Sequence, residues 1–150
     1  MSQIIVGILI FIIGQYILKL ILEPIVEFKG LFGSISAFFL REQHKIMNAS
    51  NAEINKKPND ITIDYYLQLH NEVRKLSSQL LSKSYAIPFY SFISTLLRLP
   101  SKSCILKVSH SLNLIGYNLY PYEKTNYEAI IENMKEIANI LNAPTSYSNL

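Results

Sequence analysis

Cys104 and His110 are the residues whose types best fit a catalytic pair, because an imidazole can activate a thiol as a nucleophile. Both fall on one predicted helix, six residues apart. At 3.6 residues per turn this separation places them about 240° apart around the helix axis, on different faces. We therefore predict no catalytic residues from this pair.

Metal and phosphate sites are not predicted either. The three histidines, His44, His70 and His110, lie on different predicted helices, and none has metal-ligand spacing to the cysteine. The sequence has no glycine-rich loop of the kind that holds phosphate groups. We expect no metal and no cofactor, so function has to be inferred from how the chain is built.

A stripe of polar residues interrupts the apolar N-terminal segment: Gln15, Lys19, Glu23 and Glu27 recur every four residues. Because four residues turn an α-helix by about 400°, these side chains share one slowly drifting face. One interpretation is that Lys19 snorkels to the lipid headgroups while Glu23 and Glu27 lie in water. The other is that several copies of the helix turn their stripes inward and line a pore or a hydrated seam.

Small residues follow the stripe on the same predicted helix. Gly30 and Ser34 form one pair at a spacing of four, and Gly33 and Ala37 form another on a neighbouring face. Such pairs let a second helix approach closely. The second helix can belong to the same chain or to another copy, and the sequence leaves both alternatives open.

A basic stretch lies between Glu72 and Glu123. It contains no acidic residue and six basic ones, Arg74, Lys75, Lys83, Arg98, Lys102 and Lys107, for a formal charge of +6. Tyrosines and phenylalanines are interleaved with them. This combination fits an ordinary solvated surface over an aromatic core, an anionic lipid surface, or RNA bound through phosphate contacts and base stacking.

The apolar residues are concentrated at the N-terminus of this 150-residue chain, whose mean hydropathy is +0.19. Residues 4–22 would form a helix about 28 Å long, enough to span a bilayer. No basic residue precedes this segment, whereas Lys19 lies near its end and Lys29, Arg41 and Lys45 follow it. The lack of a basic segment before Ile4 and of a small-residue cleavage site after the apolar run predicts a retained single-pass anchor in a bacterial inner membrane. The positive-inside rule predicts that its N-terminus is outside and that the rest of the chain is cytoplasmic. A lone Cys104 agrees with a reducing cytosol.

The rest of the chain predicts an all-α fold. Its predicted parts are the anchor helix and its cytoplasmic extension at 1–47, a linker at 48–60, a small helical bundle at 61–142 and a polar tail at 143–150. The pair Glu23-Pro24 is expected to kink the long first helix.

Capping residues predict where the bundle helices begin. Asp60 or Thr62 caps a helix to about Ser84, Pro88 starts a short helix at 89–97, Ser101 caps a third, and Thr125 caps a last one through a capping box with Glu128. We expect a marginal core in 61–142 alone, which packing against the extension or against other copies would complete.

Several segments resemble a family of small bacterial proteins of unassigned function that carry an N-terminal membrane helix. The similar segments are 15–33 (QYILKLILEPIVEFKGLFG), 74–80 (RKLSSQL), 87–90 (IPFY), 99–101 (LPS) and 113–118 (NLIGYN). An anchor followed by a small HEPN-like helical bundle also resembles the membrane accessory protein of type VI-B CRISPR systems. That resemblance implies an oligomeric membrane pore in antiviral defence, acting with an RNA-guided effector.

The leading hypothesis is therefore a self-assembling membrane protein that forms a pore or perturbs the membrane. One alternative is a tethered module that recruits a protein or RNA partner through the basic stretch. Another is a divergent HEPN ribonuclease. Nucleases of that type place Arg and His about four to six residues apart, whereas eleven residues separate Arg98 from His110. Their site would have to be completed across a dimer.

Overall fold

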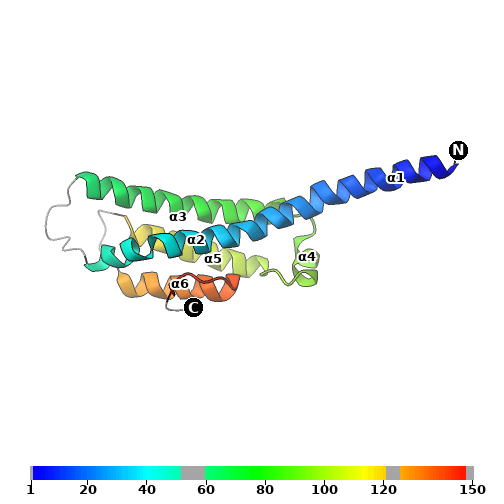
Figure 1. Cartoon of the computed structure of the whole chain (residues 1–150). Helices are drawn as coiled ribbons and strands as arrows, with labels where there is room; N and C mark the ends of the chain where they lie inside the picture. The colour runs from blue at the N-terminus through cyan, green and yellow to red at the C-terminus, as the bar shows by residue number, and fades with distance from the viewer. Residues whose placement is uncertain (1, 52–59, 121–125, 148–150) are drawn as a thin grey trace.

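The computed structural model describes residues 2–51, 60–120 and 126–147, and its regular structure within these residues is helical, with no strand. The elements are α1 (Ser2–Ile17), a π-helical turn (Leu18–Leu22), α2 (Glu23–Asn51), α3 (Asp60–Ala86), α4 (Tyr90–Leu96), α5 (Lys102–Asn118) and α6 (Tyr127–Leu141). In Figure 1, α1 projects alone from one end of a bundle made by the other helices. The predicted all-α fold with a long N-terminal helix is confirmed.

α1, the π turn and α2 form one unbroken helix. Pro24 has no N–H to donate to the carbonyl of Leu20, and its ring crowds that carbonyl in a regular α-helix. The chain accommodates the proline by widening the turn before it, where the Glu23 N–H donates to the Leu18 carbonyl five residues earlier. The disturbance predicted at Glu23-Pro24 is thus a π turn that leaves the helix continuous.

α2 supplies one side of the bundle core. Large apolar side chains recur along one of its faces, and Phe28, Ile35 and Phe39 have no exposed surface. α3 and α6 contact α2, and α5 packs against both α3 and α6. The extension of the N-terminal helix therefore belongs to the bundle and completes its core.

Helix starts agree with the predicted caps at α5 and differ at α6. The Ser101 hydroxyl accepts a backbone N–H from the first turn of α5, as predicted. At α6 the cap is Asn126, whose amide oxygen accepts from the Ala129 N–H, and the predicted cap Thr125 lies outside the described residues. The Asn126 N–H also donates to the Asn118 side chain, which ties the start of α6 to the end of α5. Asn caps helices at least as well as Thr, so this correction needs no other cause.

The predicted linker and tail are partly described. α2 continues to Asn51, so the first linker residues are helical, because no proline or glycine stops the helix there. Residues 52–59 lie outside the described residues, as do residues 148–150. Residues 143–147 lie against α2, where Ser36 donates to the Pro144 carbonyl and the Gln43 amide donates to the Ser146 hydroxyl at 3.0 Å. Buried Thr145 donates to the Met134 carbonyl of α6 at 2.9 Å.

Candidate functional site

The projecting N-terminal helix is the first candidate site. Residues 4–20 are exposed along their whole length, and none of their many apolar side chains is buried by the bundle. By length and composition this helix can cross a membrane. A lone helix with apolar side chains on every face requires apolar surroundings, because water would hydrate all of that surface.

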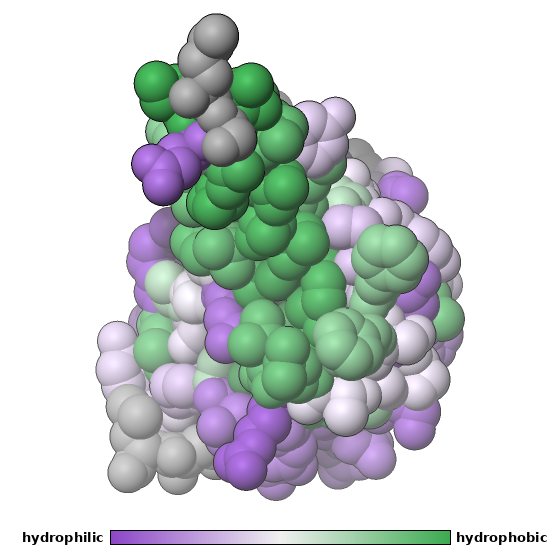
Figure 2. Space-filling model, turned by 90° about the vertical axis from the view of Figure 1, so that its right-hand side faces the viewer, coloured by the Kyte–Doolittle hydropathy of each residue, from purple (hydrophilic) through white to green (hydrophobic). Residues whose placement is uncertain are grey.

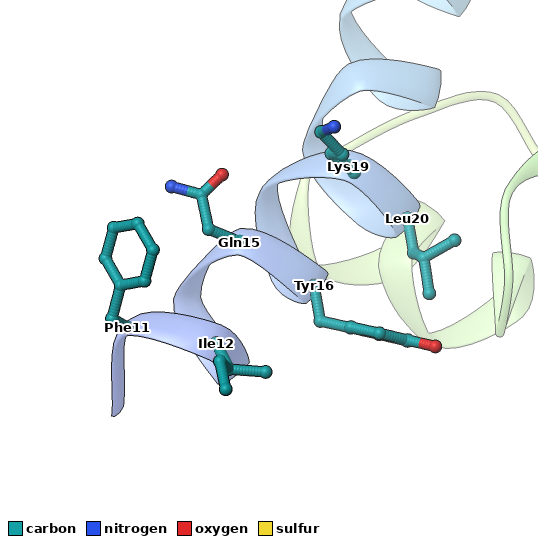
Figure 3. A pocket seen from close by; sticks show the side chains of 6 residues that line it. All are labelled: Phe11, Ile12, Gln15, Tyr16, Lys19 and Leu20. Atoms are coloured by element: carbon teal, nitrogen blue, oxygen red, sulfur yellow. The ribbon is translucent and has the colours of Figure 1, made fainter. Parts of the chain in front are cut away.

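The polar stripe begins inside this exposed helix. Figure 3 shows Phe11, Gln15 and Lys19 along one side of the helix and Ile12, Tyr16 and Leu20 along another. These side chains border a shallow hollow of about 510 Å³ on the helix flank. Gln15 lies near the middle of the predicted span, and Lys19 lies in the π turn.

The second half of the stripe belongs to the junction with the bundle. Lys83 of α3 donates to Glu27 at 2.7 Å. Lys19, Glu23, Glu27 and Lys83 together line a small cleft of about 130 Å³. Two lysines and two glutamates thus meet where the projecting helix enters the bundle. Glu27 is paired with Lys83, whereas Gln15 is exposed on the projecting helix beyond this cleft.

The small-residue face is open. A Cβ atom added to Gly30 or Gly33 would meet nothing within 4 Å, and both residues are exposed. The Ser34 hydroxyl donates to the Gly30 carbonyl at 3.1 Å within the helix. The intrachain alternative is therefore wrong for these glycines, because the other helices of the bundle pack on the other side of α2. The face is accessible to a second copy.

The basic residues lie on different sides of the bundle. Arg74 lies beside α5, where its Cγ would be 3.5 Å from a Cβ on Gly116. Lys83 reaches in the opposite direction to Glu27 of α2, as expected for residues nine apart, which are about 180° apart on a helix. Lys75 and Lys107 are exposed on α3 and α5, while Arg98 and Lys102 flank the loop between α4 and α5. The six side chains therefore do not all lie on one face of the bundle.

α4 lies at the end of the bundle from which α1 projects (Figure 1). The sequence did not predict this position beside the N-terminal helix. Tyr90 and Ile93 point into the bundle and are buried, whereas Phe89, Phe92 and Leu96 are exposed. A hollow of about 410 Å³ separates Phe89 and Pro88 from the span between Ile12 and Ile21. The available signal was the sequence YSFISTL, in which Phe92 and Leu96 lie on a different face of a helix from Tyr90 and Ile93.

A polar cluster joins α2 to α3 toward the other end of the bundle. Buried Glu42 accepts from Arg41 Nε at 2.7 Å, from the Tyr65 hydroxyl at 2.8 Å and lies 3.1 Å from Lys45 Nζ. The hydrogen bond from Arg41, supported by those from Tyr65 and Lys45, lowers the pKa of Glu42 to about 2. Arg41 also reaches Glu72 of α3 at 3.2 Å. These contacts tie α2 to α3.

The remaining chemistry-bearing residues stay dispersed. Cys104 is half-buried in the first turn of α5 and His110 is exposed further along that helix. His70 binds the Gly116 carbonyl through Nδ1 at 2.8 Å. Among the described residues no group of three His, Cys, Asp or Glu side chains could hold a metal ion.

No family model, curated protein or solved structure matches this chain. The assignment of a function therefore depends on the exposed N-terminal helix and its polar stripe.

Proposed function

We propose that this protein is a single-pass inner-membrane protein whose spanning helices self-associate through the polar stripe and thereby open or perturb the bilayer. The span comprises residues 4–22, with the N-terminus outside and the helical bundle in the cytoplasm. The basic residues that follow the span, and the absence of any before it, support this orientation.

The main support for the proposal is the position of Gln15 within the apolar helix. Its side chain is exposed near the middle of a 19-residue stretch in which isoleucine and leucine predominate and Lys19 is the only charged residue. An amide without hydrogen-bond partners in hydrocarbon costs about 2 to 7 kcal/mol. A single helix in a bilayer bears this cost, whereas helices that turn the same face toward one another can hydrogen-bond through it.

The rest of the stripe and the small-residue face support the same arrangement. Lys19 is exposed one turn beyond Gln15, so copies that meet at Gln15 also bring their lysines together. Like charges in hydrocarbon repel unless water or counter-charges accompany them, which favours a hydrated seam with Glu23 at its cytoplasmic end. The open glycines Gly30 and Gly33 let neighbouring helices continue this contact beyond the membrane.

The proposal is tested by replacing Gln15 and Lys19 together with Leu. We expect the wild-type protein in detergent to have the mass of several copies by light scattering, and to release dye from vesicles. The double variant should insert but lose both properties, because its span is uniformly apolar. Ile12→Leu with Tyr16→Phe, on the other side of the helix, is the matched control and should retain them.

Two results would contradict this function. A monomeric wild-type protein would leave Lys19 as a snorkelling anchor. Dye release that persists in the Gln15 and Lys19 double variant would show that the stripe does not line the path.

The resemblance to the membrane accessory protein of type VI-B CRISPR systems supports placing the activity in antiviral defence beside an RNA-guided effector. Protection against phage that requires Gln15 and Lys19 is the corresponding cellular test.

A further inference from the structure

α4 is apolar on both of its faces. On the inner face, the buried Tyr90 ring makes an edge contact with Phe28 of α2 at 5.8 Å, and its hydroxyl donates to the Pro100 carbonyl at 2.7 Å. On the outer face, Phe89, Phe92 and Leu96 are 82%, 71% and 68% exposed. A short helix with large apolar side chains on both faces is stabilised where both faces are removed from water. The bundle covers one face and leaves the other to its surroundings.

The outer face continues the surface of the spanning helix. Phe89 and Pro88 form one wall of the hollow whose other wall is the cytoplasmic half of the span, from Ile12 to Ile21. Figure 2 looks onto this end of the molecule and shows the hydrophobic surface of the projecting helix beside further hydrophobic surface on the bundle end. A bilayer that contains residues 4–22 therefore reaches the level of Phe89.

The edge of this surface is basic. Arg98 is exposed directly after α4, and Lys102 lies with its Nζ 5.1 Å from the ring of exposed Tyr85. Residues 84–102 contain no acidic side chain. Aromatic rings at the boundary and cations beside them match the headgroup region of an anionic leaflet.

The backbone at both ends of α4 holds this orientation. Phe89 has φ of 50° and Arg98 has φ of 53°, in the left-handed region that bulky residues rarely adopt. In water the turn at Phe89 would expose an aromatic ring, whereas in a membrane it brings that ring to acyl chains.

We propose that α4 is a second membrane-contacting element, a helix that lies in the cytoplasmic headgroup region with Phe89, Phe92 and Leu96 among the acyl chains. Acyl chains of the same leaflet fill the hollow beside the span. Arg98 and Lys102 bind the phosphates of anionic phospholipids. The inference rests on the proposed membrane placement of residues 4–22, and it is independent of self-association.

The sequence contains no tryptophan, so single tryptophans report depth without background. Full-length Phe92→Trp, Tyr16→Trp and Tyr147→Trp proteins are reconstituted into vesicles of phosphatidylcholine and phosphatidylglycerol that carry brominated acyl chains. Circular dichroism checks that each variant keeps its helix content. We expect quenching and a blue-shifted emission for Tyr16→Trp and Phe92→Trp. Tyr147→Trp, which is exposed near α2 residue Gln43, should be unquenched.

The outcomes separate the two proposals. Quenching of Tyr16→Trp without quenching of Phe92→Trp would overturn the role of α4 and leave the spanning helix intact. Absence of quenching at both positions would overturn the membrane placement itself. Adding Arg98→Gln and Lys102→Gln to Phe92→Trp should reduce quenching in anionic vesicles to its level in neutral ones. Equal quenching with and without anionic lipid in the parent Phe92→Trp protein would overturn the phosphate assignment.

Discussion

At the scale of single residues, Glu42 shows how a charged side chain can be buried in the bundle. Its carboxylate is buried between α2 and α3, and three cationic or hydroxyl groups surround it. The hydrogen bond from Arg41 is the largest cause that lowers its pKa from 4.5 to about 2. The folded protein therefore binds this proton less readily than the unfolded chain does.

Acid unfolding follows from that difference. The stabilisation by ionised Glu42 is complete above about pH 4.5 and is lost as the pH falls toward 2. We predict that Glu42→Gln lowers the free energy of unfolding near neutral pH by about 1 to 3 kcal/mol, because charge-assisted hydrogen bonds are lost. Denaturant titrations at several pH values measure this. The variant should have a smaller loss of stability than wild type between pH 4.5 and 2, and an unchanged loss would contradict the role of Glu42.

At the scale of the elements, two helices can approach closely where a glycine of one faces the other. Gly116 of α5 is buried, and a Cβ there would lie 3.5 Å from Arg74 and 3.8 Å from Val73 of α3. Gly33 of α2 faces open space. Both occur in helices without a positive φ, so their difference is one of packing.

A pair of matched substitutions tests this difference. Gly116→Leu should destabilise the protein by about 1 to 3 kcal/mol, because the larger side chain must push α3 away from α5. Gly33→Leu should change the free energy of unfolding of the monomer by no more than about 0.5 kcal/mol, as at other open surface sites. Thermal unfolding followed by circular dichroism in detergent measures both. Equal effects would show that α3 and α5 do not approach at Gly116.

At the scale of the whole molecule, the two parts of the long helix have different surroundings: the first part is exposed, and the second part packs in the bundle. Its first part has no buried residue among those described, whereas α2 contributes Phe28, Ile35 and Phe39 to the bundle core. Residues 143–147 pack on the same helix through Ser36 and Gln43. α2 is therefore the element that connects the exposed apolar helix to the bundle.

This connection predicts where the chain can be shortened. A protein beginning at Glu23 should retain the bundle and unfold in one cooperative transition in mild detergent, because every core residue is kept. A protein beginning at Asp60 should lose that transition, because the removed α2 leaves the apolar faces of α3 and α6 uncovered. Calorimetry of the two proteins measures this, and a cooperative transition in the shorter one would show that α2 is dispensable for the core.

Patterns within a few residues were sufficient to predict the helices and the apolar N-terminal segment. The hydrophobic pattern of a helix involves residues three and four positions apart, and the Ser101 cap involves one turn of helix. Both features can therefore be predicted from the sequence alone. The predicted helix end near Ser84 lies within two residues of the observed end of α3 at Ala86.

Only the tertiary structure decided which faces meet. Sequence spacing places Glu27 on the polar stripe, but its contact with Lys83 joins residues 56 positions apart. The same limitation concealed the buried Glu42 cluster and the position of α4 beside the span. Helical periodicity specifies the direction of a side chain around its own axis and carries no information about the neighbour that lies in that direction. Packing of the whole bundle supplies that neighbour, and so decides which side chains are left for a membrane or another copy.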